Sequence, residues 1–553
     1  MEAKAILFDT RSIQRYIYSG NKLRTNIGAS YLVDTVYDEV LFPVLQKKYG
    51  ENGVDTESWR QGKMLSEMPD TIKCAVSSNG GGNLMLVLRE GTANDLKGIV
   101  AEFSKKLLVE RPGLHIGAAF DECVHVDETE AFQKDLERLY EKLKENQMSV
   151  FPEVSIPYTG LTLNCPVSGE TANYIDKYGK IQPQGRKELH FYSQEIAVKA
   201  LASEKSTKRL KSMYADISKR FDFPTQLEDL GQREQENYIA IVHIDGNNMG
   251  VKFRACNTQK ERSQLSEEIR LKTEGCFGKL LESIAEDYDH YRDYLDIGEE
   301  FVEEGSKRLL PIRPLILGGD DVTFVCPAKL ALKLTKNFIE YMMTEDSVEG
   351  LTSEWARRVD CCAGIAILKT SYPFFRGYKL AESLCDEAKK KMRSMMQSAE
   401  KGKEVPSHET SWLDFAILHG EQAPTLKEIR EQEYSGARGN MHFGPYQVGH
   451  DLGKQVSEHR YDIENLIEAV HQLQKENVMA HNKIKKMRSV LQHGKHEAQE
   501  FLVQLEHQGQ RLPDIPEWEV FTKPENALWS TEKEARTPYV DAIEMMDFIP
   551  KEA

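Results

Sequence analysis

Three aspartates have the types and spacing that metal-dependent phosphate chemistry requires. Asp320 and Asp321 follow two glycines in the stretch LILGGDDVTFV, between two apolar runs, and Asp245 ends the apolar run YIAIVHID. Adjacent carboxylates repel each other, and removing them from water costs free energy unless a cation is near. If the strand that ends at Asp245 is a neighbour of the hairpin that carries Asp320 and Asp321, the three carboxylates converge. Two hard cations bound by such carboxylates are what in-line displacement at phosphorus requires. We predict a site for two Mg²⁺ or Mn²⁺ ions, although each motif alone is also typical of an exposed turn.

Glycines and cations near these aspartates suggest that the ligand carries phosphates. Gly246 and Gly250 in DGNNMG would let the backbone approach a phosphate closely. In CDEAKKKMR, Lys389 and Arg393 are four residues apart, so they share one face of a helix and would be able to clamp a triphosphate. A solvated cationic face is the alternative interpretation of this run.

These residues need a sheet edge to hold them, and the sequence predicts one. Residues 238–250 read as a buried strand that ends in a turn, and a long helical stretch leads from there to the GGDD bend. The run DCCAGIAIL at 360–368 and a lysine-rich helix from Gly377 to about Ser398 follow. The predicted order is strand, helix, glycine bend, strand, strand, helix.

The same order occurs in the first part of the chain. A strand at 5–8 precedes an amphipathic helix from about Ile13, and the bend NGGGN leads to an apolar run at 84–88. The run LHIGAAF at 114–120 and a charged helix at 128–146 complete the unit. We therefore predict a duplicated α+β unit. The expected domains are a first unit at 1–150, a largely helical connector at 151–235, a second unit at 236–405 and a C-terminal helical domain at 406–553.

Composition limits the class of protein. The 553 residues are 40% hydrophobic and 29% charged, as in a globular protein, and the net charge of −16 counts against a general nucleic-acid binder. The sequence contains no apolar span of about 20 residues and no signal peptide in MEAKAILFDT, so we expect a cytoplasmic protein without a membrane partner. Nine scattered cysteines without a CxxC pair do not support a disulfide framework.

The motifs GGDD, DGNNMG, CAGIAILKTSYPFFRGYKLAESLCDEAKKK and SIQRYIYSGNKLRTNIGAS together resemble the large palm-domain subunit of type III CRISPR effector complexes. More distantly, the core is similar to diguanylate cyclases and class III nucleotide cyclases. The resemblance implies two ferredoxin-like palm domains in a pseudo-dimer, with helical accessory domains. It also implies synthesis of cyclic oligoadenylates from ATP in the second palm, in antiviral defence.

Carried onto this chain, the resemblance assigns roles to residues of the second palm. Asp245, with the Gly246 carbonyl, and the pair Asp320 and Asp321 would bind the metal ions and carry catalysis. The residues that would contact the nucleotide in this palm are Asn247, Asn248, Met249, Gly250, Gly318, Gly319, Lys389 and Arg393.

The first palm is the degenerate copy. Asp9 stands at its strand end, but Gly81, Gly82, Asn83 and Leu84 occupy the place of the acidic bend, so no metal is expected there. The resemblance makes this palm the wall that holds the acceptor nucleotide. The candidates for lining that wall are Gly28, Ala29, Ser30, Gly81 and Gly82.

Departures from the family narrow the expected activity. The chain starts directly at the first palm without an HD nuclease pair, so it resembles an HD-less or stand-alone relative, and cutting of target DNA is not implied. The family's zinc site between the palms has two cysteine pairs, whereas LNCPVSGETA keeps only Cys165, which does not support zinc. Expected partners are ATP, guide-RNA effector subunits or an activating RNA, and a downstream effector that senses the cyclic product. The alternatives are a catalytically silent scaffold that senses nucleotide and a cyclic dinucleotide synthase that uses GTP.

Overall fold

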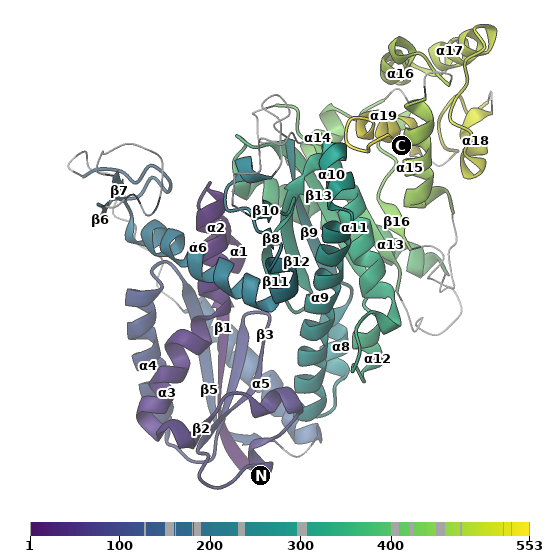
Figure 1. Cartoon of the computed structure of the whole chain (residues 1–553). Helices are drawn as coiled ribbons and strands as arrows, with labels where there is room; N and C mark the ends of the chain where they lie inside the picture. Colours follow the sequence, from purple (N-terminus) through teal and green to yellow (C-terminus); the bar gives the residue numbers. More distant parts are fainter. Residues whose placement is uncertain are drawn as a thin grey trace.

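The computed structural model describes residues 2–126, 129–149, 160, 162–177, 179, 181, 190–230, 238–295, 307–399, 409–420, 425–436, 438–449, 459–475, 478–523, 525–531 and 534–551. Two mixed sheets dominate this part of the chain, one near the N-terminus and one in the middle of the sequence (Figure 1). Helices cover their faces, and a helical region follows the second sheet.

The first sheet has five strands in the order β2-β3-β4-β1-β5. Its strands are β1 (Glu2–Arg11), β2 (Val54–Asp55), β3 (Cys74–Gly80), β4 (Asn83–Leu88) and β5 (His115–His125). Its helices are α1 (Ile13–Tyr18), α2 (Leu23–Asp34), α3 (Phe42–Tyr49), α4 (Ala93–Glu110) and α5 (Thr129–Met148). One face packs against α5 through Ala5, Leu7 and Leu139, and the other face joins the main core of the molecule.

The second sheet has six strands in the order β11-β12-β9-β13-β14-β16. Its strands are β9 (Tyr238–Gly246), β11 (Arg313–Gly318), β12 (Asp321–Pro327), β13 (Cys361–Lys369), β14 (Ser411–Ile417) and β16 (Tyr446–Val448). Its helices are α8 (Met249–Ala255), α9 (Gln259–Glu286), α10 (Tyr288–Leu295), α11 (Ala328–Met343), α12 (Glu354–Arg357) and α13 (Phe374–Ala399). Residues 239–244 of β9 are all buried, as expected for a central strand covered on both faces.

The two sheets share one core topology. In each, the first strand of the unit lies between the third and the fourth, and the second strand lies outside the third. The strands β1, β3, β4 and β5 thus correspond to β9, β11, β12 and β13. The predicted α+β fold with a duplicated unit is confirmed at the level of strand order.

The remaining elements connect and extend the two units. Between the sheets lie β6 (Tyr174–Asp176), β7 (His190–Tyr192), α6 (Gln194–Met213), α7 (Ala215–Ser218) and β8 (Phe221–Asp222), which pairs with β10 (Arg308–Leu309). After β14 come α14 (Leu426–Gln432), β15 (Gly439–Asn440), α15 (Ile463–Leu473), α16 (His481–His493), α17 (Lys495–His507), α18 (Glu519–Thr522), β17 (Ala535–Arg536) and α19 (Tyr539–Met545).

Helices from each unit contact the other unit. Tyr18 of α1 stacks on Tyr378 of α13 with ring centroids 4.1 Å apart, and Ser263 of α9 donates a hydrogen bond of 2.6 Å to the Ser77 carbonyl of β3. One apolar cluster runs from the first sheet through the second to the C-terminal helices. The two units are therefore joined by a common core.

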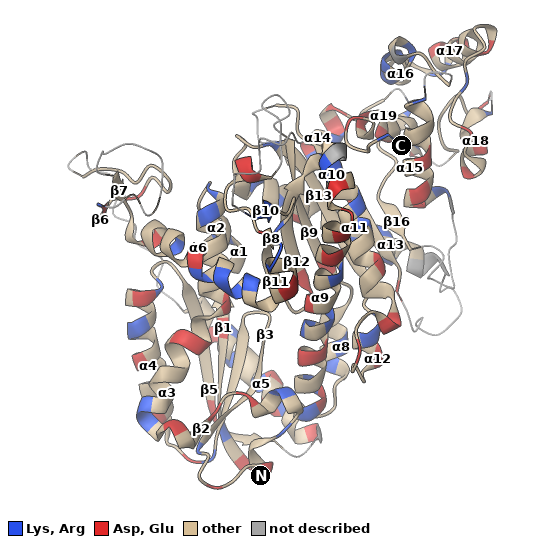
Figure 2. Cartoon of the chain, in the orientation of Figure 1, with Lys and Arg blue, Asp and Glu red and all other residues tan. Residues whose placement is uncertain are grey.

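Charged residues of both signs are interspersed over the helices of both units (Figure 2). In the described part of the chain, no helix combines the length and the apolar character that spanning a membrane would demand.

Candidate active site between the two palms

The three aspartates lie at one end of two neighbouring strands. β9 and β12 pair in antiparallel fashion with Asp245 opposite Asp321, which confirms the predicted adjacency of the two runs. β12 continues into a hairpin with β11 in which Gly318 pairs with Asp321, so Gly319 and Asp320 form the two-residue loop. Gly319 has a φ of +61°, a region that favours glycine in tight hairpins. Residues opposite each other on adjacent strands have their side chains on the same face, so Asp245 and Asp321 are neighbours.

Gly246 fixes the position of the loop. Its backbone N–H donates to the Asp320 carbonyl at 3.2 Å, and a Cβ at residue 246 would come within 2.8 Å of the Cβ of Asp320. Real Cβ atoms do not approach a neighbour this closely, so only glycine lets the end of β9 lie against the loop. Sequence reasoning assigned Gly246 to the phosphate and the metal, whereas the structure gives it this packing role as well.

The carboxylates perturb one another. Burial raises the pKa of Asp320 to about 7, and the charges of Asp245 and Asp321 add to the rise. Lys389 of α13 forms an ion pair with Asp245, and the side chains of the two residues are 14% and 35% exposed. Burial alone would lower the pKa of Lys389, but the carboxylate of Asp245 outweighs it and the pKa is raised. One cation of the chain therefore already compensates part of the negative charge.

A histidine beside the aspartates, His243, was missed in the sequence. It precedes Asp245 by two residues on β9, and its Nδ1 lies 3.3 Å from Oδ1 of Asp321. Burial acts to lower the pKa of His243, but the nearby carboxylate of Asp321 outweighs it, so the pKa is raised. The signal was available, because residues two apart on a strand share a face and a histidine within an otherwise apolar strand stands out.

The donor types are those of hard divalent cations, but among the described residues the ligand atoms of Asp245, Asp320 and Asp321 do not form a group that lies within 4.8 Å of one another, so these side chains would have to turn inward to share ions. Carboxylate oxygens are the ligands that Mg²⁺ prefers in proteins, and three carboxylates here lie close enough to raise the proton affinity of one of them. Within the described part of the chain, no hydrogen-bond donor is assigned to the buried Oδ1 of Asp321, while Nδ1 of the nearby His243 lies 3.3 Å from Oγ1 of Thr323. Asp245, Asp320 and Asp321 are thus the residues that would hold such ions.

The asparagines after Asp245 secure the turn. Asn247 is fully buried, and its Nδ2 donates to the Thr410 carbonyl at 3.1 Å. Asn248 adopts a left-handed conformation with φ of +51°, and its Nδ2 donates to Glu409. Met249 and Gly250 begin α8. The polar contacts seen for the two asparagines are internal to the protein, and the predicted contact of these four residues with nucleotide stays a prediction.

The first palm repeats this geometry without the acids. Asp9 pairs across β1 and β4 with Asn83, in the position where Asp245 pairs with Asp321. Gly81 and Gly82 form the two-residue loop, with φ of +59° and +79°. Gln147 of α5 donates a hydrogen bond of 2.7 Å to Asp9, as Lys389 of α13 does to Asp245. In the first palm, where Asp9 is the one carboxylate of the three, the neutral amide of Gln147 thus takes the position that Lys389 has in the second palm.

A cleft of about 290 Å³ separates the two loops. Gly81 and Gly82 line one side, and Gly318, Gly319 and Asp321 line the other. Ser30 also lines this cleft, and its hydroxyl donates to the Leu315 carbonyl of β11, which ties α2 to the second palm. The cleft further contains four arginines that sequence reasoning did not single out: Arg60, Arg209, Arg270 and Arg313.

A second hollow of about 200 Å³ is lined by Gly319 and Asp320 of the acidic loop. Gly80, Gly81 and Asn83 of the first palm line it, together with Arg262 of α9. The acidic loop therefore lines both hollows and faces the glycine loop of the first palm.

Two of the residues predicted to line the acceptor wall pack within the protein. A Cβ at Gly28 would come within 1.7 Å of the Lys199 carbonyl, so Gly28 marks the close contact of α2 with α6, and Ala29 is fully buried. Neither lines the two hollows described above, and their predicted contact with the acceptor stays a prediction. Arg393 is exposed one turn beyond Lys389 on α13.

Comparisons with known proteins show which proteins this chain is similar to. The sequence model of the Cas10/Cmr2 second palm domain matches residues 238–397, whereas a search of curated proteins found no match. A crystal structure of a Csm1-Csm4 cassette in complex with pppApApA is similar, with a TM-score of 0.50 and 12% identity over 95% of this chain and 69% of the other. The cassette with cA3 gives a TM-score of 0.46 at 12% identity, over the same shares of the two chains. Residues 238–397 therefore match a Cas10/Cmr2 second palm domain, and the fold of the chain is similar to that of the Csm1-Csm4 cassette.

Proposed function

We propose that the chain is a nucleotidyltransferase that converts ATP into cyclic oligoadenylates with release of pyrophosphate. The observation that carries this proposal is the register of Asp245 with Asp321, with Asp320 in the adjoining loop, opposite the first palm, which keeps only Asp9. The match to a Cas10/Cmr2 second palm supports a nucleotidyltransferase at a coarse level. The similar Csm1-Csm4 cassette was solved with the adenylate pppApApA, which favours ATP as the substrate class.

In this proposal, the aspartates, Lys389 and the glycine loop of the first palm have separate roles in binding metal ions, triphosphate and acceptor. Asp245, Asp320 and Asp321 would hold two Mg²⁺ or Mn²⁺ ions. When bound, these ions neutralise the charge of the triphosphate and lower the pKa of the attacking ribose hydroxyl. Lys389 would release Asp245 and turn to the triphosphate, since both groups compete for the same cation. The glycine loop of the first palm would hold the acceptor in line with the donor.

No protein side chain is assigned as a general base. Asn247 and Asn248 stand after Asp245, where they hold the turn through their own hydrogen bonds. The proposal further includes assembly with other type III subunits, because the similar Csm1 chain was solved together with Csm4. An activating RNA and a downstream effector that senses the product, in antiviral defence, complete the proposal.

The test is the double substitution Asp320→Ala and Asp321→Ala. We expect the wild-type chain to convert labelled ATP into cyclic products identified by mass when Mg²⁺ or Mn²⁺ is present, and the double variant to release no pyrophosphate above background. The control is Asp70→Asn with Asp346→Asn, which changes the charge equally at side chains that are 99% and 94% exposed.

Each outcome has a defined meaning. Full activity in the double variant would overturn the assignment of the site. Cyclic products from GTP but not from ATP would favour the cyclic dinucleotide synthase. Absence of product from either nucleotide, with and without guide-RNA subunits, would favour the silent scaffold.

A further inference from the structure

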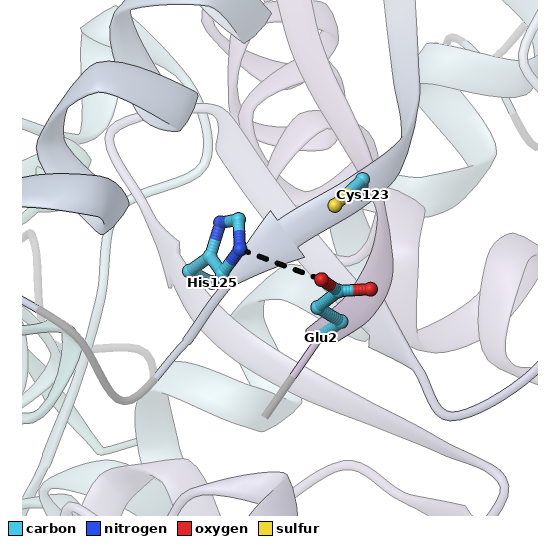
Figure 3. Close-up of side chains that lie close together, drawn as sticks. All are labelled: Glu2, Cys123 and His125. Carbon is cyan, nitrogen blue, oxygen red and sulfur yellow. Dashed lines mark ion pairs between the residues drawn. The ribbon is translucent and has the colours of Figure 1, made fainter.

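Three potential metal ligands converge in the first sheet, where β1 starts and β5 ends (Figure 3). They are Glu2 on β1 and Cys123 and His125 on β5, and one ligand atom of each lies within 4.8 Å of the others. Nε2 of His125 is 3.8 Å from Oε1 of Glu2. We infer that these three residues form a binding site for a transition-metal ion, of which Zn²⁺ is the expected occupant.

The backbone brings the three side chains together. Glu2 and His125 are directly opposite each other in the antiparallel pair of β1 and β5, so their side chains share one face of the sheet. Cys123 precedes His125 by two positions, and its Sγ lies within 4.8 Å of the ligand atoms of the other two residues. The register between the strands shifts here, since Ala3 pairs with Val124 and Ala5 with Asp121. Bulges of this kind re-aim side chains and are common at functional sites.

A carboxylate behind His125 orients its ring. Oδ2 of Asp135 lies 2.9 Å from Nδ1 of His125 and also accepts the backbone N–H of His125 at 2.8 Å. Asp135 pairs in addition with Arg138 at 2.8 Å. An acceptor at Nδ1 places the proton of the neutral imidazole there and leaves the lone pair on Nε2, toward Glu2 and Cys123. Zinc-bound histidines show the same arrangement, in which the second nitrogen donates to a carboxylate.

The chemistry of the donors selects the ion. A thiolate, an imidazole and a carboxylate are the ligand types of Zn²⁺, and three protein ligands leave a fourth position for water. Ligands of a tetrahedral zinc ion are separated by roughly 3.5 Å, which a rotation of the exposed Glu2 side chain can provide. Mg²⁺ takes oxygen ligands, so the ion proposed here differs in kind from those proposed for the second palm.

The site is also separate in space from the aspartates of the cleft. Glu2 and Asp9 are at opposite ends of β1, seven residues apart, which is roughly 23 Å of extended strand. β5 is the edge strand of the first sheet. A bound ion would therefore fasten the start of β1 to the edge strand and stabilise the first palm without taking part in the palm chemistry.

The experiment uses the full chain after removal of metal with a chelator, and Co²⁺ is the probe. We expect Co²⁺ to bind with the charge-transfer absorption of a thiolate ligand, and one equivalent of Zn²⁺ to displace it. Excess Mg²⁺ should leave the absorption unchanged. Cys123→Ser should remove this absorption, and Zn²⁺ affinity should fall more than about tenfold in Cys123→Ser and His125→Gln. Asp135→Asn should weaken Zn²⁺ binding by about 10- to 100-fold while the absorption remains.

The matched control is Cys165→Ser, because Cys165 lies in the connector and does not belong to the group of Glu2, Cys123 and His125. This variant should keep both the Co²⁺ absorption and the Zn²⁺ affinity. Circular dichroism verifies that each variant is folded, and Glu2→Gln gives a second, exposed test of the ligand set. Absence of the absorption in the wild-type chain with excess Co²⁺ would overturn the inference. So would its persistence in Cys123→Ser or its loss in Cys165→Ser. None of these readouts depends on nucleotide turnover.

Discussion

At the scale of single residues, the candidate site places a lysine and a histidine beside its three carboxylates. Asp245 pairs with Lys389, and Asp321 lies beside His243, while burial and both neighbours raise the pKa of Asp320 to about 7. In the first palm, where only Asp9 remains, a glutamine takes the place of the lysine. The charge of each partner thus follows the number of carboxylates it has to compensate.

The role of Lys389 as a stand-in cation predicts a specific response to metal. In Lys389→Met, Asp245 loses its partner beside two other aspartates, so the free energy of unfolding without metal should fall by about 1–2 kcal/mol. Mg²⁺ should then raise the melting temperature more than in the wild-type chain. Lys390→Met is the control, because Lys390 pairs with Glu387 at the surface of the same helix. An equal Mg²⁺ effect in both variants would contradict the prediction. Calorimetry with and without Mg²⁺ measures it.

The two glycines of DGNNMG should differ in importance. Gly246→Ala would force its Cβ against Asp320 and displace the acidic loop, so we expect the rate of product formation to fall by about 100-fold or more in a folded protein. Gly250→Ala should retain most of the activity, because its Cβ would meet only the end of Arg254 at 3.8 Å. Initial rates of pyrophosphate release, with circular dichroism as the check on folding, distinguish the two. Similar losses in both variants would refute this division of roles.

At the scale of elements, close helix contacts are marked by glycines whose role the sequence left open. Gly28 lets α2 lie directly on the Lys199 carbonyl of α6, and a Cβ at Gly364 of β13 would come within 1.9 Å of the Ala381 carbonyl of α13. Gly117 of β5 stands in the equivalent strand but faces the side chain of Gln147, which is able to move. Gly117 pairs with Asp9 as Cys362 pairs with Asp245, so Gly117 and Gly364 are not equivalent positions, and only Gly364 is required by the close packing of a helix backbone on the sheet.

Substitution at Gly28 tests this account. Gly28→Ala should lower the free energy of unfolding by about 1–3 kcal/mol, because the helices must separate to admit a methyl group beside backbone atoms. Gly98→Ala in α4 should instead raise it by up to about 1 kcal/mol, since Gly98 is exposed, has open space around it and lies inside a helix. Denaturant unfolding of both variants measures the difference. A stabilised Gly28→Ala would show that α2 and α6 do not pack as described.

A buried histidine ties the C-terminal helix α19 to the second sheet and predicts a pH dependence. His442 lies 2.8 Å from both Asp414 of β14 and Asp541 of α19. Burial and Arg430 act to lower the pKa of His442, but the two carboxylates outweigh them and the pKa is raised. A raised pKa in the folded state stabilises the protein fully below the unfolded value of about 6.5 and ceases to do so as pH rises through the folded value.

Unfolding midpoints in denaturant should therefore fall as the pH rises above about 6.5, and His442→Gln should flatten this fall. His496→Gln, at an exposed histidine of α17, is the control and should keep the wild-type slope. An unchanged slope in His442→Gln would remove His442 as its cause.

At the scale of the whole molecule, the sequence predicted what depends on local patterns. Apolar runs that end in Asp245 and begin after Asp321 indicated the strands, and the repeated order of elements indicated the second unit. What it did not predict arises from contacts between distant segments. The arginines of the cleft come from α6, α9, β11 and the segment before β3, and the contact of α6 with Gly28 depends on how the connector folds back. Periodicity within one segment carries no information on which other segment covers it.

Because both walls of the cleft belong to one chain, the rate per chain should not depend on chain concentration. The acidic loop and the glycine loop face each other within the fold, so association of two chains is not needed to complete the site. We expect the initial rate per chain to stay constant over a dilution of about 100-fold, whereas a site shared between two chains would lose activity by mass action.

Adding excess Asp320→Ala, Asp321→Ala chain to the wild-type chain separates the two cases at a single concentration. A site within one chain predicts an unchanged rate, since the inactive chain offers nothing that the active chain lacks. In a site built from two chains, the variant would replace wild-type partners and the rate would change. A rate that falls on dilution and responds to the added variant would show that the cleft of one chain is not the working site.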